Sequence, residues 1–126
     1  MFKVETPETF NETWARAFNT GNLDNLLALY EDDAILADPT RTVRGKEKIA
    51  ELLQGLMSIP GTLSGRNNFC LRHGDLALLR ADWMLSDPDG KQIMSGSSAE
   101  IIRRQLDGRW LYVVDHAVGS SLPPVI

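Results

Sequence analysis

The hydrophobic period differs between the two halves of this chain, and that difference constrains the fold more than any other feature. In the first half, apolar side chains recur every three or four residues, as they do along one face of a helix. The second half consists of strand-like runs separated by turn sequences. Folds of the α/β class alternate helices and strands along the chain, whereas this chain segregates them. We therefore expect an α+β fold.

Three amphipathic helices are expected in the first half. The first starts after Thr6 with Pro7 at its first position, the second is capped by Asn22, and the third follows Gly45. A short strand is expected over residues 34–37. The apolar faces of the helices contain the side chains that would form the wall of a pocket: Trp14, Phe18, Tyr30, Leu53 and Met57.

The second half is expected to form an antiparallel meander. Its turns carry Gly74, Gly90 and Gly108, where the backbone can adopt a positive φ. The strand-like runs are residues 63–72, 76–85, 92–104 and 109–118. Amphipathic helices and a meander bury their apolar faces by packing together on one side of the sheet. We expect a cone: a curved, mostly antiparallel sheet packed by three N-terminal helices around a cavity.

Composition limits the partners that this chain can bind. With 126 residues it is expected to be a single domain over residues 1–126. Its net charge of −4 argues against nucleic acid and against an anionic membrane surface. No apolar run is long enough to span a bilayer, and the N-terminus does not resemble a signal peptide. The single cysteine, Cys70, allows no internal disulfide and favours a reducing, cytoplasmic setting.

Several segments together resemble the nuclear-transport-factor-2-like superfamily, and within it the SnoaL-like, ketosteroid-isomerase-like branch. These segments are residues 18–24, residues 29–34, the Asp38-Pro39 pair, the Arg44-Gly45 pair, residues 107–110 and the Asp115-His116 pair. The resemblance covers nearly the whole chain and implies the cone fold. The superfamily includes isomerases, dehydratases, cyclases, epoxide hydrolases and non-catalytic binding or association domains, so it leaves the activity open.

Asp38 stands at the end of the expected short strand, next to Pro39. The resemblance places it in register with the general base of ketosteroid isomerases. A carboxylate in an apolar cavity resists ionisation, so its pKa rises towards a value suited to proton transfer. The alternative is that Asp38 and Pro39 only initiate a turn.

Glu100 matches, under the resemblance, the protonated acid that donates a hydrogen bond to an enolate oxygen. It shares a strand face with Ile102, which we expect to contact the substrate. The alternative is a solvent-facing glutamate paired with an arginine across the sheet.

Asp115 and His116 are adjacent on a strand, so only one of them can face the cavity. The resemblance favours Asp115, in phase with Leu111 and Val113. With only two histidines and one cysteine in the chain, no metal site is expected.

The run 76–85 gives conflicting indications. Its alternation places Arg80 and Asp82 in water, whereas the resemblance places them in the cavity, with Arg80 as a clamp for an anion or a carbonyl. We give the alternation precedence.

Trp14 stands where the isomerase pattern has a catalytic tyrosine. An indole N–H is a single donor that does not titrate, so we do not expect efficient ketosteroid isomerase activity. Tyr30 could supply a hydroxyl from another angle, although both residues could equally belong to the helix core.

The sequence therefore predicts an enzyme that transfers protons on an apolar, carbonyl- or epoxide-bearing small molecule. Asp38 would be the base, and Glu100 or Asp115 the proton donor. No cofactor is required, since no nucleotide-binding loop is found. The alternative function is a non-catalytic ligand-binding or association domain. A homodimer is expected in either case, because helices on one side of the sheet leave its other face uncovered.

Overall fold

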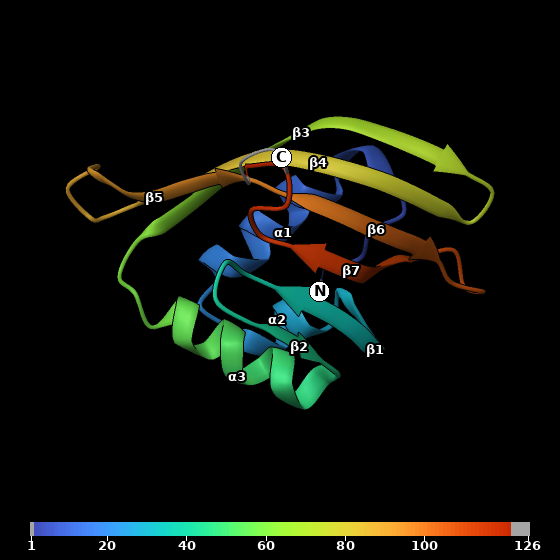
Figure 1. Ribbon diagram of the computed structural model, residues 1–126, viewed down its shortest axis with the longest axis horizontal. Coiled ribbons are helices and arrows are strands. Elements are labelled where there is room, and N and C mark those ends of the chain that lie inside the picture. The colour runs from blue at the N-terminus through green and yellow to red at the C-terminus, as the bar shows by residue number, and fades with distance from the viewer. Residues whose placement is uncertain (1, 122–126) are drawn as a thin grey trace, which may run out of the picture.

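The computed structural model describes residues 2–121. They form a curved sheet with helices on its concave side (Figure 1). A 3-10 turn, Pro7–Thr9, precedes the first helix. The helices are α1 Phe10–Asn19, α2 Leu23–Leu27 and α3 Lys46–Met57. The strands are β1 Tyr30–Ala37, β2 Thr42–Arg44, β3 Thr62–His73, β4 Leu76–Ser86, β5 Gln92–Ser97, β6 Ala99–Arg104 and β7 Trp110–His116. Helices in the first half and a meander in the second confirm the α+β prediction.

Two of the three helices begin at the positions that the sequence predicts. The side chain of Asn22 accepts the backbone N–H of Asp24 at 3.0 Å and so caps α2. Gly45 precedes α3 with a φ of 88°, a conformation that other residues rarely adopt. The first helix differs: Pro7 opens a 3-10 turn, Thr6 makes no side-chain cap, and α1 begins only at Phe10.

Tyr30 does not belong to the second helix, which ends at Leu27. It is the first residue of β1, which is longer than the strand expected over residues 34–37. Tyr30 pairs in parallel with Tyr112 of β7, and the backbone N–H of Tyr112 donates to the carbonyl of Leu29 at 2.8 Å. A contact across more than 80 residues of chain thus overrides the helical spacing of this segment.

The sheet order is β2-β1-β7-β6-β4-β3, and β5 pairs with β4 beside this path. Among the strand pairs within residues 2–121, only β1–β7 is parallel. The run expected as one strand over residues 92–104 is divided at Ser98 into β5 and β6, and both parts pair with β4. The mostly antiparallel meander is therefore confirmed, with β1 and β2 added at its β7 edge.

Irregular pairing in β7 decides which of its side chains face the helices. Ile102 pairs with Tyr112, but Ile101 pairs with Val114, so Val113 is an extra residue in the ladder. The alternation changes phase there, and Tyr112 and Asp115 are both buried. Asp115 points inwards as expected, but it shares its face of the strand with Tyr112 rather than with Leu111 and Val113.

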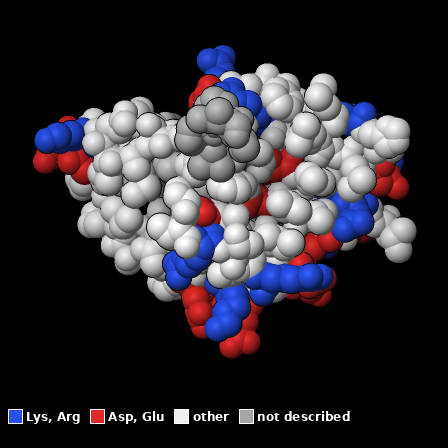
Figure 2. Space-filling view, in the orientation of Figure 1, with Lys and Arg blue, Asp and Glu red and all other residues white. Residues whose placement is uncertain are grey.

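The outer face of the sheet carries apolar side chains that the helices do not cover. They lie on β3, β4, β5 and β6 and include Phe69, Leu71, Leu76, Leu78, Met84, Ile93 and Ile101. Figure 2 shows one side of the molecule, on which basic and acidic side chains lie next to one another at the margins. Ion pairs on the surface include Arg44–Asp33 and Arg103–Glu31. Within residues 2–121, no helix has the length and hydropathy needed to cross a membrane.

Candidate functional site

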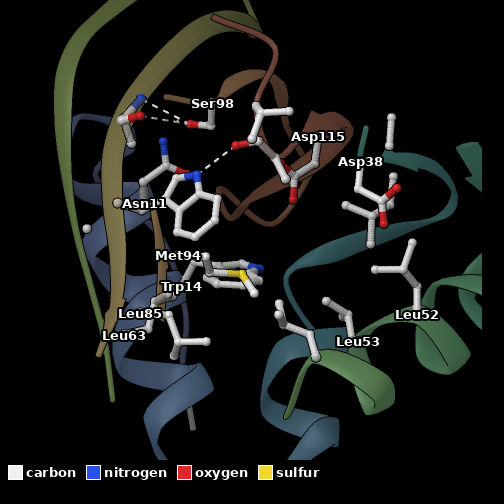
Figure 3. Close-up of a pocket in the computed structure, with 18 of the residues that line it drawn as sticks. Asn11, Trp14, Asp38, Leu52, Leu53, Leu63, Leu85, Met94, Ser98 and Asp115 are labelled. Carbon is white, nitrogen blue, oxygen red and sulfur yellow. Dashed lines mark hydrogen bonds between the residues drawn. The ribbon is translucent and has the colours of Figure 1, made fainter. Parts of the chain in front are cut away.

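A cavity of about 530 Å³ lies between the concave face of the sheet and helices α1 and α3. Most of its lining is apolar, including Trp14, Leu52, Leu53, Leu63, Leu85 and Met94. Its polar lining residues include Asn11, Asp38, Ser98, Glu100 and Asp115. In Figure 3 the labelled polar residues lie in the upper half of the view and the labelled leucines in the lower half. The cavity therefore has an apolar end and a polar end.

Five of the nine residues proposed from the sequence line this cavity: Trp14, Asp38, Leu53, Glu100 and Asp115. The other four are not among its lining residues. Phe18, Tyr30 and Ile102 are buried in the core, and Met57 packs against that core. Of these four, Tyr30 still reaches the site, because its hydroxyl donates to Asp115.

Glu100 and Asp115 are the buried acids of the cavity, with 3% and 7% of their surface exposed. They are register partners on β6 and β7 and lie against each other. Burial, followed by the negative charge of Asp115, raises the pKa of Glu100 to about 8. Burial also raises the pKa of Asp115 to about 6, opposed by hydrogen bonds from Tyr30 and Glu100. At neutral pH the pair therefore holds one proton, on Glu100.

One chain of hydrogen bonds ends on Asp115. The indole N–H of Trp14 donates to the Tyr30 hydroxyl at 2.9 Å, and this hydroxyl donates to Asp115 Oδ2 at 2.7 Å. Burial, then the charge of Asp115, raises the pKa of Tyr30 well above its usual value, so the phenol keeps its proton. The chain thus favours the ionised form of Asp115.

A second chain ends on Glu100. The Tyr112 hydroxyl donates to Asn11 Oδ1 at 2.6 Å, and Asn11 Nδ2 donates to Glu100 Oε1 at 2.9 Å and to Asn67 Oδ1 at 2.7 Å. The Asn67 amide nitrogen in turn donates to the backbone carbonyl of Glu8 at 2.7 Å. These contacts fix the orientation of both amides. Since the carbonyl oxygen of a carboxylic acid is its better acceptor, the hydrogen bond from Asn11 to Oε1 favours the proton of neutral Glu100 on Oε2.

Sequence reasoning did not identify Asn11, although the sequence contains a signal for it. On a helix, Asn11 shares a face with Trp14, Ala15 and Phe18, three, four and seven residues further on. A polar side chain on an otherwise apolar face must find a partner when it is buried. Asn11 is 7% exposed and has three such partners.

Asp38 lies at the rim, and its pKa differs from the expectation. Its side chain is 25% exposed, and its Oδ1 accepts the backbone N–H groups of Thr40 and Arg41 and the Thr40 hydroxyl. Partial burial raises the pKa of Asp38, but these hydrogen bonds and the charge of Arg41 together lower it below its ordinary value. The turn expected as the alternative role of Asp38 is therefore present, and the expected rise in pKa is wrong.

The alternation of β4 correctly predicts the face of Arg80 and Asp82. Leu79, Ala81 and Leu85 are buried towards the helices, whereas Asp82 is exposed on the outer face. Arg80 donates to Asn68 at 2.6 Å on that same outer face. Arg80 therefore does not contribute a positive charge to the cavity. Within residues 2–121, no cluster of three histidine, cysteine or acidic side chains could hold a metal ion.

The fold and the cavity define this protein as an α+β cone domain with a largely apolar interior. The family model of the SnoaL-like domain matches residues 11–113. The chain belongs to this family. A search of curated proteins found no match.

Solved structures with the same fold have low sequence identity. A putative calcium/calmodulin-dependent protein kinase type II association domain from Thiobacillus denitrificans is 20% identical, with a TM-score of 0.79 over 94% of this chain and 98% of that one. Its counterpart from Xanthomonas campestris is 22% identical, with a TM-score of 0.70 over 93% and 86% of the two chains. A ketosteroid isomerase-like protein from Erwinia carotovora atroseptica is 19% identical, with a TM-score of 0.69 over 87% and 90%. At these identities the likeness shows the fold alone.

Proposed function

We propose that this protein binds a small apolar molecule in its cavity and catalyses proton transfer on it with Glu100 and Asp115, without a cofactor. The observation that carries the proposal is a pair of buried carboxyl groups, paired across neighbouring strands on the cavity wall, whose surroundings raise both pKa values. A pair of acids whose pKa values are pushed apart by their surroundings can act as acid and base in one site.

In this proposal Asp115 is the base. It accepts a proton from the bound molecule, and the hydrogen bond from Tyr30 stabilises its ionised resting state. Glu100 is the acid: once Asp115 is protonated it no longer attracts the Glu100 proton, which is then free to move to a second position on the molecule. Asp38, whose pKa is lowered at the rim, is the weaker base and takes a binding role in this scheme.

Ketosteroid isomerase activity stays excluded from the proposal. The indole N–H of Trp14 is already donated to Tyr30, so it is not free to stabilise an enolate oxygen. Removing one donor of this kind typically costs about 10²–10³ in rate.

The test is a carbon-13 titration of the carboxyl groups. We expect Glu100 to titrate near pH 8 and Asp115 near pH 6, with Glu100→Gln and Asp115→Asn assigning the signals. Glu47→Gln, at an exposed position of α3, is the matched control and should leave both titrations unchanged. Normal titration of both acids near pH 4 would contradict the proposal and favour a cavity that only binds.

A second candidate function, an association domain, is favoured by the apolar outer face of the sheet. Two of the similar structures carry this description, which we apply to the present chain only as a proposal. We expect a homodimer through this face, with Leu78→Lys shifting the sedimentation coefficient to that of a monomer. A wild-type monomer at micromolar concentration would contradict it. The cytoplasmic setting rests on the single cysteine and is likewise a proposal.

A further inference from the structure

At the polar end of the cavity, the N–H and O–H groups of the side chains donate hydrogen bonds to one another. The Trp14 indole N–H is used by Tyr30, and the Tyr30 hydroxyl by Asp115. Both N–H groups of Asn11 are used by Glu100 and Asn67. An amide has two N–H donors and no more, so Asn11 has none left for a ligand.

The same holds for the remaining side-chain donors around this end. The Tyr112 hydroxyl is donated to Asn11. The Trp83 indole N–H is donated to the carbonyl of Ala117 at 2.6 Å. The Ser98 hydroxyl accepts the N–H of Ala81 at 3.1 Å, and its own hydrogen is shared between the Ala81 carbonyl at 3.4 Å and Glu100. Both indole rings that line the cavity therefore present apolar surface only.

Backbone N–H groups along the cavity wall are also occupied. Those of Asp38, Ser98 and Ala117 donate to the carbonyls of Arg41, Ala81 and Ala37, each at 2.9 Å. Those of Thr40 and Arg41 donate to the Asp38 carboxylate. Among the described residues, the donors that remain open are Arg41, whose side chain is 56% exposed, and the exposed Ser95, both at the mouth.

Acceptors, in contrast, are in excess at the polar end. An ionised carboxylate has about four acceptor positions, and the contacts of Asp115 within residues 2–121 are with Tyr30 and Glu100. The ion pairs among these residues include neither Asp115 nor Glu100. The polar end therefore offers a negative, acceptor-rich surface inside an apolar cavity.

We propose that the ligand is an apolar molecule whose polar group donates a hydrogen bond to Asp115: an alcohol or an alkylammonium ion, and not a ketone. The inference rests on the proposed function, in that the ligand occupies the same cavity, and it narrows the substrate class. A carbonyl or epoxide oxygen placed here would face the carboxylate without a free donor, because the proton of neutral Glu100 is already donated to Asp115. An unpaired buried acceptor is costly. A hydroxyl or ammonium group supplies the donor that the cavity lacks.

The test compares three molecules with one rigid skeleton: 2-adamantanol, 2-adamantylammonium and 2-adamantanone. Binding is measured at neutral pH from the proton–nitrogen NMR signals of the indole groups. Trp14 and Trp83 line the cavity, whereas the buried Trp110 does not and serves as internal control. We expect the alcohol and the ammonium ion to bind at least about 10-fold more tightly than the ketone, the ratio that one unpaired buried group produces.

Two nearly isosteric variants should each strengthen ketone binding, and Asp115→Asn should also weaken ammonium binding. Asp115→Asn replaces an acceptor by an N–H donor, so ketone binding should strengthen and ammonium binding should weaken, each by about 10-fold. In Glu100→Gln, the Asn11 amide holds the new carbonyl oxygen, so the new N–H₂ group points to the Asp115 side and adds a donor. Ketone binding should strengthen there while ammonium binding persists. Circular dichroism shows whether each variant is folded, and failure of one leaves the other as the test.

The outcomes separate this inference from the proposed function. Equal binding of alcohol and ketone, or tighter binding of the ketone, overturns the inference, while the carboxyl titrations still decide the proton-transfer proposal. Shifts at Trp110 without shifts at Trp14 and Trp83 would place binding outside the cavity and also overturn it. If none of the three molecules binds, both the inference and the ligand-binding part of the proposed function are wrong.

Discussion

Two aspartates on the lining of one cavity, Asp115 and Asp38, have pKa values displaced in opposite directions. Asp115 is fully enclosed and receives its hydrogen bonds from side chains of other strands, and its pKa is raised. Asp38 lies at the rim in a turn whose own backbone N–H groups bond to it, and its pKa is lowered. Contact with an apolar cavity is therefore insufficient to raise a pKa, because several local donors can outweigh partial burial.

The largest expected effect is a pH dependence of stability that comes from the enclosed pair. A raised pKa means that the folded protein binds more protons than the unfolded chain between the two values. The stabilisation is complete below the unfolded pKa and is lost as the pH rises through the folded one. We expect the free energy of unfolding in urea to fall by about 3–5 kcal/mol between about pH 4.5 and 8.5.

The variant Glu100→Gln provides the control for that slope, since it cannot titrate. Most of the pH dependence over this range should be absent from it. A wild-type protein whose stability stays constant from pH 4.5 to 8.5, within about 0.5 kcal/mol, would show that the pair is not displaced as proposed.

A somewhat smaller effect is expected for Asn11→Leu. The change removes donors to Glu100 and Asn67 and leaves the Tyr112 hydroxyl without its acceptor. Each buried polar group left unpaired costs about 1–3 kcal/mol, so we expect a loss of about 2–4 kcal/mol in urea unfolding. Asn68→Ala, at the neighbouring position to Asn67 but on the exposed face, should cost about 0.5 kcal/mol. Similar losses in the two variants would remove the distinction between enclosed and surface amides.

The variant Tyr30→Phe tests how the Tyr30 hydroxyl affects the pKa of Asp115. The Tyr30 hydroxyl stabilises the ionised carboxylate, so its removal should raise the pKa of Asp115 further in the carbon-13 titration. The Trp14 indole N–H also loses its acceptor, and we expect a loss of about 1–2 kcal/mol in stability. An Asp115 titration that shifts to lower pH would show that the hydroxyl acts on Asp115 differently.

The smallest effect is expected for Asp38→Asn. The amide oxygen can still accept the N–H groups of Thr40 and Arg41, so the turn should persist with a loss of at most about 1 kcal/mol. The titrations of Glu100 and Asp115 should not change. If Asp38→Asn lowers the pKa of either buried acid, the rim and the enclosed end are electrostatically connected and the contrast between them is wrong.

Local signals in the sequence were sufficient for much of the fold. The Asn22 cap, the Gly45 start and the hairpin glycines each act through contacts within a few residues, and each was predicted correctly. Tyr30 was misplaced because its spacing from Leu26 and Leu27 suits a helix, whereas its pairing with Tyr112 decides otherwise.

The candidate site depends more on distant contacts, which is why the sequence predicted it less completely. Asp115 was correctly expected to face inwards, but Leu111 and Val113 were wrongly expected to share its face, because no local pattern in β7 reveals that Val113 is an extra residue. The low pKa of Asp38 follows from the geometry of its turn rather than from residue type. The hydrogen bonds of Asn11 join α1 to β3 and β6, which the sequence alone cannot bring together.

The extra residue Val113 also divides β7 into two parts that can change separately in evolution. On its N-terminal side, Trp110 is fixed by the packing of the core, and on its C-terminal side Asp115 belongs to the cavity. Because Val113 stands outside the ladder, its deletion would restore a regular strand and keep Asp115 paired with Glu100. A second inserted residue at this point would likewise stand outside the ladder and leave Asp115 paired with Glu100. The length of this bulge can thus change in evolution while the paired acids and the core half of the strand stay as they are.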